Sequence, residues 1–384
     1  MSRFEKFSLA FLILIAAILW AAVDWNFFRD VWQSPLGPSM ALTDVAPAPE
    51  ASPTDLLSPI APVFSTLQNA KQTPHVESAP LCGGPRLMTV LAIGSDTRAS
   101  GYLYGLADVI RLVRVDFVTP RVTVLEFPRD LWVEIPEIAA HYGITHGKIN
   151  QAYLYGNPGM GYYQGPGQGP GLLARTLDLN FGTRPDHYIA ANMQTFVQLI
   201  NVIGGIDVYL PYSVDARKAD QPKRDDLYFE PGKHHLNGEQ ALMLARIREH
   251  STFGRADQQN RVLCAAREAL LNPYNLPKLP EIIDTFDKAV QTDLSPQQIS
   301  QMACLAPQLK PGNIAFITFP RELLTEARTF DIGVNKDVYI FKADFNTLRL
   351  YVSAFNTGIW PDPNPTAAPA GTPRPPGEGG FSCP

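Results

Sequence analysis

The chain has 384 residues, a formal net charge of -5, 45% hydrophobic residues and 18% charged residues. This is enough for one large domain or two ordinary ones with a sizeable hydrophobic core. The balance is mildly acidic and the basic residues form no long stripe, so we expect no nucleic-acid partner.

The N-terminus predicts a membrane anchor. Arg3 and Lys6 precede an apolar stretch, residues 7–23, in which Ser8 is the only polar side chain, and aromatic residues follow it as in a membrane-interface belt. The stretch is at the short end for a spanning helix. A cleaved signal peptide is the alternative, because small residues lie near its end. We favour an uncleaved anchor, because the stretch is long for a signal and lacks a clear Ala-x-Ala site.

The charge pattern around this anchor predicts a single-pass topology. The basic residues come first, so we expect residues 1–6 in the cytoplasm and the rest of the chain outside the cell membrane. Residues 34–81, rich in Pro, Ala, Ser and Thr, predict a disordered stalk, and residues 361–384 a disordered Pro/Gly-rich tail. Residues 86–360 remain as the folded part.

The four cysteines leave their pairing open. Cys82, Cys264, Cys304 and Cys383 allow three pairings, and none form a Cys-x-x-Cys motif. Cys264 and Cys304 both lie in helical patterns and are one possible pair, while Cys82 and Cys383 flank the folded region. Four free thiols are the alternative.

The folded part alternates strands and helices. Residues 87–93 form an apolar run that ends at Gly94, typical of a buried strand, and residues 108–117 and 121–126 predict a hairpin through Thr119-Pro120. We therefore predict an α/β fold, a single domain with a central mixed β-sheet flanked by helices on both faces, together with the N-terminal transmembrane helix. Further strands are expected at 187–191, 206–210 and 314–319, and further helices at 171–179, 193–203, 257–271, 279–290, 296–306 and 345–355, with Asn237 capping one more.

Two aspartates follow neighbouring strands of this pattern. Asp96 comes just after the strand that ends at Ile93, and Asp108 opens the next strand. Such a pair can share one Mg²⁺, which takes one or two carboxylates together with phosphate oxygens and water. The alternative for each is a turn or capping residue. Arg129 projects beyond a strand that Pro128 interrupts, and its alternative role is an ion pair with Asp130 or another local carboxylate.

An arginine-rich run at residues 246–261 stands out on the acidic background. Arg246 and Arg248 are two apart, so they share a face only on an extended segment, and the helix from Asn237 should end near residue 245. Arg255 and Gln259 are four apart on the next helix, with Arg255 near its N-terminus, where anions are favoured. Guanidinium groups suit phosphate oxygens. A solvated helix face is the alternative.

The ordered set of these segments, with the anchor, resembles the LytR-CpsA-Psr family of envelope proteins. The resemblance covers roughly residues 86–271, and residues 272–355 look like the usual C-terminal part of the same domain. The matching pieces are Gly94-Ser95-Asp96-Thr97-Arg98, Asp108, Phe127-Pro128-Arg129-Asp130, Lys148-Ile149-Asn150-Gln151-Ala152-Tyr153, Asp186-His187-Tyr188, Gly204-Gly205-Ile206-Asp207-Val208, Leu236-Asn237-Gly238-Glu239-Gln240-Ala241-Leu242, Arg246-Ile247-Arg248 and Phe253-Gly254-Arg255 with Gln259.

The resemblance implies an envelope phosphotransferase. Such enzymes move a glycopolymer from a polyprenyl-pyrophosphate carrier to peptidoglycan or another cell-wall glycan. By motif match, Asp96 and Asp108 would hold Mg²⁺. The residues implied for the pyrophosphate are Arg98, Arg129, Arg246, Arg248, Arg255 and Gln259, and the four arginines from Arg129 to Arg255 would also stabilise the transferred group. Asp108 and Asp130 are the only candidates for a general base.

Two positions depart from the family pattern. Leu106 stands where the family often has an arginine, two residues before the second aspartate, and Gln258 replaces a second arginine. Two other functions therefore stay open. One is a non-catalytic module that binds polyprenyl lipid or cell-wall glycan, and the other is a polyprenyl-pyrophosphate hydrolase in which water replaces the acceptor.

Overall fold

The fold was analysed in a computed structural model of the chain. It describes residues 29–40, 42, 78–97, 102–217, 224–247, 252–278, 281–282, 289–310, 312–361 and 381–383. The predicted anchor at residues 7–23 lies outside these ranges. Within them, no helix has the length and apolar character needed to cross a membrane.

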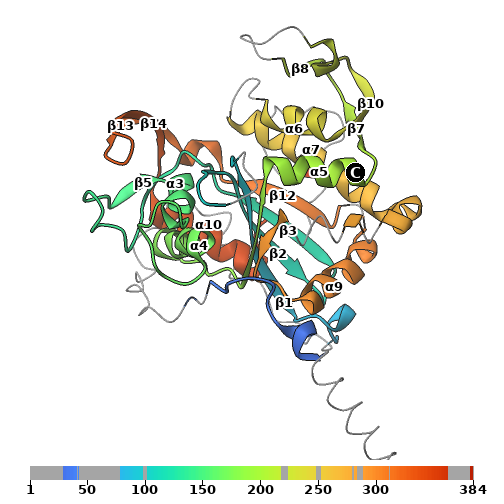
Figure 1. The fold of residues 1–384 in the computed structure, drawn as a ribbon, viewed down its shortest axis with the longest axis horizontal. Helices are drawn as coiled ribbons and strands as arrows, with labels where there is room; N and C mark the ends of the chain where they lie inside the picture. The colour runs from blue at the N-terminus through green and yellow to red at the C-terminus, as the bar shows by residue number, and fades with distance from the viewer. Residues whose placement is uncertain are drawn as a thin grey trace, which may run out of the picture.

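A central mixed sheet of seven strands organises the domain (Figure 1). Antiparallel pairing joins β1 to β2, β2 to β3, β6 to β11 and β12 to β15, whereas β1 pairs with β6 and β3 with β12 in parallel. The strands, in spatial order, are β11 (Gln291–Thr292), β6 (His187–Asn192), β1 (Leu87–Ser95), β2 (Ala107–Asp116), β3 (Arg121–Glu126), β12 (Ile314–Thr318) and β15 (Phe381–Ser382).

Both faces of this sheet are covered. On one face, Leu91, Ile93, Ile110 and Leu112 pack in a core cluster with α3 (Ile149–Gly156), α4 (Gln168–Phe181) and α10 (Phe345–Thr357). On the other face, Met88, Val90 and Val115 pack with Leu305 of α9 (Pro296–Leu305). The strand residues alternate between these two faces, as a period of two requires. The predicted mixed α/β domain is confirmed.

A second hydrophobic core lies outside the central sheet. It is built by α5 (Met193–Val202), α6 (Gly238–Arg246), α7 (Thr252–Leu271) and the pair β7 (Ile206–Leu210) and β10 (Gly232–Leu236). Figure 1 shows these helices together, away from α3, α4 and α10. Residues 206–210 are a strand as predicted, but β7 pairs with β10 in a separate two-stranded sheet.

The remaining elements are short hairpins and 3-10 turns. They include the hairpin of β13 (Thr325–Asp331) and β14 (Lys336–Lys342), which the sequence analysis did not identify. The others are β4 (Trp132–Glu134) with β5 (His146–Lys148), β8 (Val214–Asp215) with β9 (Tyr228–Phe229), and 3-10 turns at Leu81–Gly83, Asp225–Leu227, Pro273–Lys278, Ala306–Gln308 and Arg321–Leu323. Most of the helix predicted at residues 279–290 lies outside the described residues.

The first part of the predicted stalk is packed against the domain. The Leu36 N–H donates to the carbonyl of Leu294 at 3.1 Å, and Met40 is 2% exposed within the core that contains α4. The prediction of disorder is therefore wrong for residues 34–40. Apolar side chains such as Met40 give this Pro-rich segment enough surface to bury. Residues 43–77 lie outside the described ranges.

All four cysteines form disulfides, and one of these bonds holds a residue of the tail that was predicted to be disordered. Cys82 is bonded to Cys304, and Cys264 to Cys383. Of the possibilities that the sequence left open, neither the Cys264–Cys304 pair nor four free thiols is present. Cys264 packs with Val124 and Phe316, whereas Leu305 of α9 packs with Met88 and Val90.

Residues 381–383 are also ordered, since Phe381–Ser382 pairs with β12 and Cys383 is buried next to it. The expectation of disorder does not hold for residues 381–383.

Candidate functional site

A cavity of about 570 Å³ lies between the central sheet and the helices α5, α6 and α7. Small residues of the sheet, Ala92, Gly94 and Ala191, leave room for it, and Phe196 and Leu242 line it from the helices. At Gly94 a side chain would collide with Val109, since a Cβ would lie 2.9 Å from the Val109 Cβ. Most lining residues are apolar, so the cavity suits a hydrocarbon chain.

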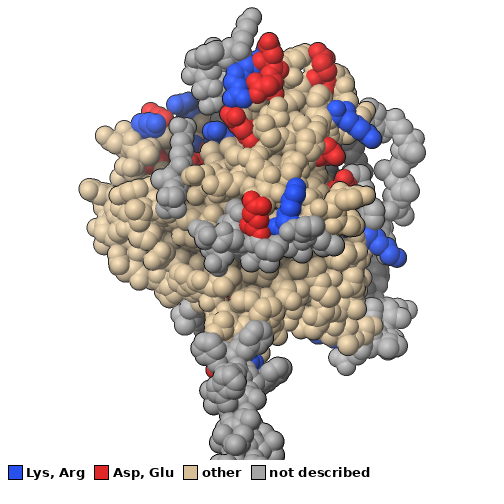
Figure 2. Space-filling view, turned by 45° about the vertical axis from the view of Figure 1, so that its right-hand side comes forward, with Lys and Arg blue, Asp and Glu red and all other residues tan. Residues whose placement is uncertain are grey.

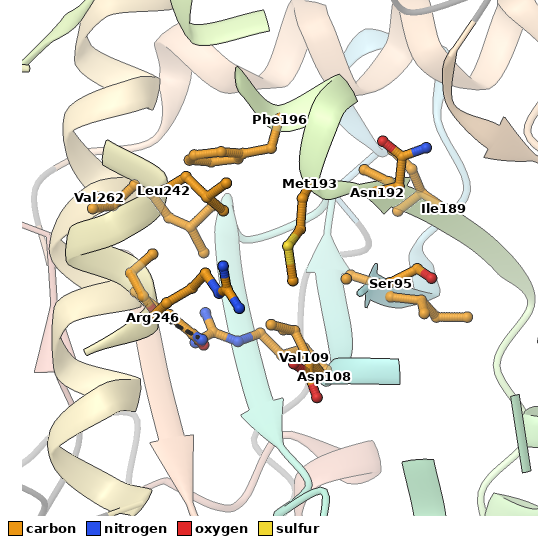
Figure 3. Close-up of a pocket in the computed structure, with 18 residues that line it drawn as sticks. Ser95, Asp108, Val109, Ile189, Asn192, Met193, Phe196, Leu242, Arg246 and Val262 are labelled. Atoms are coloured by element: carbon orange, nitrogen blue, oxygen red, sulfur yellow. Dashed lines mark hydrogen bonds between the residues drawn. The ribbon is translucent and has the colours of Figure 1, made fainter. Parts of the chain in front are cut away.

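Charged groups gather at one side of this cavity. Of the lining residues in the described chain, Asp108, Arg111 and Arg246 are charged. Figure 3 shows Arg246 and Asp108 low in the view, whereas Phe196 and Met193 lie above them. The cavity is therefore amphipathic, with an apolar part and a charged part that holds two guanidinium groups and one carboxylate.

A β-bulge positions Asp108 at the rim of the sheet. Gly94 pairs with Val109 and Ser95 pairs with Ala107, so Asp108 is an extra residue on β2. Bulges commonly redirect a side chain next to a functional site. This irregularity turns Asp108 toward the cavity even though its neighbours Ala107 and Ile110 are fully buried.

Arg129 is held between two carboxylates, one of them Asp108. Its Nη1 donates to Oδ1 of Asp108, and its Nε lies 3.5 Å from Oδ2 of Asp130. Lys148 then donates from Nζ to Oδ1 of Asp130 at 2.7 Å. This series of contacts, from Lys148 through Asp130 to Arg129 and Asp108, fixes the guanidinium of Arg129, which follows β3 in the sequence. Both ion pairs that the sequence left open for Arg129 are present, and Asp130, 8% exposed, is saturated by cations.

Arg246 occupies the last position of α6, so the helix ends one residue beyond the predicted end near residue 245. Asn237 caps this helix in a capping box with Gln240, and the backbone becomes extended at Ile247. Arg246 lines the cavity and has no ion pair within the described residues. The predicted partners Arg98 and Arg248 lie outside the described residues, as does the side chain of Arg255 on α7.

Gln259 also lines the cavity, but it has a structural role as well. Its Oε1 accepts from Nη2 of Arg111 at 3.1 Å, and its Nε2 donates to the carbonyl of Ala245 at 3.2 Å. Gln259 thus links β2 to the end of α6, next to Arg246. Arg111 was not among the predicted site residues, because it lies inside a largely apolar strand pattern. That strand also carries Arg114 at an interior position, so the sequence did not single out Arg111.

Asp96 and Asp108 come to the same edge of the sheet. The Asp96 N–H donates to the carbonyl of Leu106 at 3.0 Å, and its Oδ1 accepts from the Leu106 N–H at 2.7 Å. Asp108 contributes one oxygen to Arg129. Each carboxylate keeps a second oxygen, which fits a Mg²⁺ site that is completed by phosphate and water. In the described residues, no group of three or more His, Cys, Asp or Glu side chains could hold a metal on its own.

Half-buried Tyr102 and fully buried Tyr153, both close to the cavity rim, stay protonated. The Tyr102 hydroxyl accepts from the Asn192 N–H at 3.1 Å and donates to the carbonyl of Ala289 at 2.5 Å. Burial raises the pKa of Tyr102 and, more strongly, the pKa of Tyr153. Neither phenol is therefore suited to act as a base at neutral pH.

Two arginines close to β8 and β9 are paired with opposite charges. Arg217 contacts Asp215 at 2.8 Å, and Arg224 contacts both Asp226 and Glu239. Figure 2 shows blue and red side chains side by side at the top of the molecule, where β8 lies in Figure 1, over a face that is otherwise mostly uncharged. The cationic side chains on this face are therefore interspersed with acidic ones.

The fold and the site define a member of a known family. The model of the LytR_cpsA_psr family matches residues 66–347, and the chain belongs to this family.

Curated relatives include proteins of bacterial cell-wall biology. The Regulatory protein MsrR of Staphylococcus aureus is 26% identical over 271 residues, which cover 70% of this chain and 74% of that protein. The polyisoprenyl-teichoic acid–peptidoglycan teichoic acid transferase TagV of Bacillus subtilis is 30% identical over 213 residues, 54% of this chain and 49% of TagV. The corresponding transferase TagU of Oceanobacillus iheyensis is 31% identical over 218 residues, 56% of this chain and 61% of TagU.

Solved structures share the fold. The crystal structure of Bacillus subtilis TagV aligns with a TM-score of 0.52 at 24% identity, covering 70% of this chain and 97% of that one. Protein gbs0355 of Streptococcus agalactiae aligns with a TM-score of 0.53 at 22% identity, covering 68% and 84%.

Proposed function

We propose that this protein is a phosphotransferase that moves a glycopolymer from a polyprenyl-pyrophosphate carrier to peptidoglycan or another cell-wall glycan. The observation that carries the proposal is the amphipathic cavity. Its apolar part matches a polyprenyl chain, and its charged part, with Arg246 and with Asp108 paired to Arg129, matches a pyrophosphate. The names of TagV and TagU describe teichoic acid transfer to peptidoglycan, which is the same class of reaction.

In the proposed reaction, an acceptor hydroxyl forms a bond to the phosphorus that carries the glycan. The bond from that phosphorus to the bridging oxygen breaks, and polyprenyl phosphate leaves. Positioning and charge stabilisation supply most of the catalysis of such transfers. Arg246 and Arg129 neutralise the phosphate oxygens, joined by Arg98, Arg248 and Arg255. In this proposal neither candidate base takes the acceptor proton, which is released to solvent. Asp130 is saturated by Lys148 and Arg129, and Asp108 is paired with Arg129 and assigned to Mg²⁺.

Asp96 and Asp108 would hold Mg²⁺, which would supply further neutralisation of the pyrophosphate charge. The ion pair with Arg129 leaves Asp108 oriented for this role.

The proposed location is the outer face of the cell membrane, with a single N-terminal anchor at residues 7–23. The two disulfides support it, because such bonds persist mainly in oxidising compartments outside the cytoplasm. Fractionation of cells, followed by external protease, tests the location. The full-length chain is expected in the membrane fraction and accessible to protease, and protection of the domain would overturn this topology.

Incubation of the full-length protein with a polyprenyl-pyrophosphate glycan, Mg²⁺ and cell-wall oligosaccharide tests the activity. Transfer of the glycan to the oligosaccharide supports the proposal. Release of phosphorylated glycan to water, with acceptor present, identifies a hydrolase, and tight binding without turnover identifies a non-catalytic module. Either of those results would contradict the transferase.

A further inference from the structure

Arg111 is a buried cation that the fold does not fully use. It lies in the middle of β2, is 3% exposed, and lines the cavity. Its Nη2 donates to Oε2 of Glu126 at 2.9 Å and to Oε1 of Gln259 at 3.1 Å. Its Nε and Nη1 are buried and have no hydrogen-bond partner in the described part of the chain. Buried N–H groups almost always have a hydrogen-bond partner, so we expect a bound ligand to accept from these donors.

The surroundings of Arg111 argue against a purely structural role. One ion pair with Glu126 would anchor it to β3, yet the guanidinium is stacked 5.6 Å from the ring centroid of Phe316 and remains at the cavity wall. Arg114 offers a comparison on the same strand. It faces the opposite side of the sheet, where its Nε donates to the carbonyl of Asn356, and it does not line the cavity.

Two neighbouring glutamines of α7 point in different directions. Gln258 is 3% exposed, does not line the cavity, and donates from Nε2 to the hydroxyl of Tyr212 at 3.3 Å. Gln259 lines the cavity and accepts from Nη2 of Arg111. The contact of α7 with Arg111 therefore runs through Gln259 and does not use the Nη1 donors.

We infer that Arg111 is a further anion-binding residue of the cavity, which donates from Nη1 to the pyrophosphate of the lipid carrier and supplies positive charge from the sheet. This inference rests on the proposed function. The guanidinium is always charged and Nη1 carries two N–H groups, so a phosphate oxygen satisfies it without a change of fold. Arg246 then approaches the same ligand from α6, and Arg111 from the sheet.

Titration of the full-length protein in detergent with farnesyl pyrophosphate and with farnesol tests the inference. Arg111→Gln is expected to weaken pyrophosphate binding about tenfold or more while leaving farnesol binding unchanged. Arg114→Gln is the matched control and is expected to bind both as the wild type does. Arg111→Lys keeps the pair with Glu126 but loses the Nη1 donors, so it is expected to show a several-fold loss even if Arg111→Gln does not fold.

The comparison with Arg114→Gln separates ligand contact from structure, because both variants remove an arginine of β2 but only Arg111 lines the cavity. Unchanged pyrophosphate affinity in both Arg111→Gln and Arg111→Lys would overturn the inference while the proposed function stands. If the wild type itself prefers farnesol to the pyrophosphate, the proposed function fails and the inference with it.

Discussion

The Arg129 guanidinium donates to the carboxylate of Asp108, which joins the end of β3 to the bulge of β2. Their side chains are 16% and 25% exposed, so the pair is partly shielded from water. It fixes a cation and an anion at the same place on the cavity rim. A phosphate and a divalent ion bound there would meet both charges already oriented, which lowers the cost of organising the site.

Arg129→Lys tests this orientation. Lysine keeps the charge but loses the planar fork that contacts Asp108 and Asp130 together, so the transfer rate is expected to fall at least about tenfold. The rate with purified lipid carrier is the measurement. Arg175→Lys is the control, because Arg175 of α4 pairs with Glu137 and does not line the cavity. A rate equal to the wild type in Arg129→Lys would refute a role for the fork.

Asp96→Asn tests the proposed metal site. The amide oxygen still accepts from the Leu106 N–H, but the negative charge is lost. The Mg²⁺ concentration for half-maximal rate is therefore expected to rise about tenfold or more. Titration of Mg²⁺ in the transfer assay measures it, and a chelator is expected to abolish wild-type activity. Full activity in chelator, or an unchanged Mg²⁺ requirement in the variant, would count against the site.

Ala191→Phe tests the apolar part of the cavity. Ala191 lines the cavity from the end of β6, so a phenyl ring there would occupy space needed by a long hydrocarbon chain. The rate with a long polyprenyl carrier is expected to fall about tenfold, and the rate with a farnesyl carrier much less. Because both carriers are tested on the same variant, the rate with the farnesyl carrier is the control for the rate with the long one. Equal losses with both would show that the chain does not enter this cavity.

Cys383→Ser tests the disulfide that fastens the C-terminal strand. The bond to Cys264 closes a separation of 119 residues, and its loss is expected to lower the free energy of unfolding by about 2–5 kcal/mol. Thermal or denaturant unfolding measures this. The double variant Cys264→Ser/Cys383→Ser should be no less stable than the single one, because the bond is already absent. Peptide mapping that finds Cys264 bonded to Cys304 would contradict the pairing.

Asp344 gives a stability prediction that depends on pH. It caps α10, and hydrogen bonds from Thr347 and from the Asn346 N–H hold the pKa of its carboxyl below the usual value. The contribution of a lowered carboxyl pKa is present above the unfolded value, about 3.9, and is lost as pH falls through the folded value. Asp344→Ala should therefore cost about 1 kcal/mol at neutral pH and progressively less below about pH 4. Asp344→Asn, which still caps, is the control, and a pH-independent cost of Asp344→Ala would contradict this reading.

Local patterns were sufficient for most elements near the site. The apolar run of β1, the hairpin of β2 and β3, and the capping box at Asn237 each depend on a few neighbouring residues, and all three are confirmed. The convergence of Asp108 and Arg246 on one cavity was implied by the family resemblance and not by the local patterns.

Features that depend on distant contacts could not be read from local sequence. The order at Cys383 comes from its bond to Cys264 and from pairing with β12, while the preceding Pro/Gly-rich composition indicates only a loop. The burial of Met40 has the same origin. Arg111 was hidden because a strand pattern records apolar periodicity, and only the packing of α7 shows that this charge faces a cavity.

The most direct test of the account is product analysis in the transfer assay, comparing the wild type with Arg246→Gln. Arg246 lines the cavity on α6, beside the carbonyl that Gln259 binds, and has no ion pair within the described ranges, so its removal should act on the ligand more than on the fold. The account predicts a glycan joined to the cell-wall oligosaccharide by a phosphodiester, with polyprenyl phosphate as the second product, and at least about a hundredfold slower formation in Arg246→Gln. Equal rates in the two proteins, or no phosphodiester product from the wild type, would contradict it.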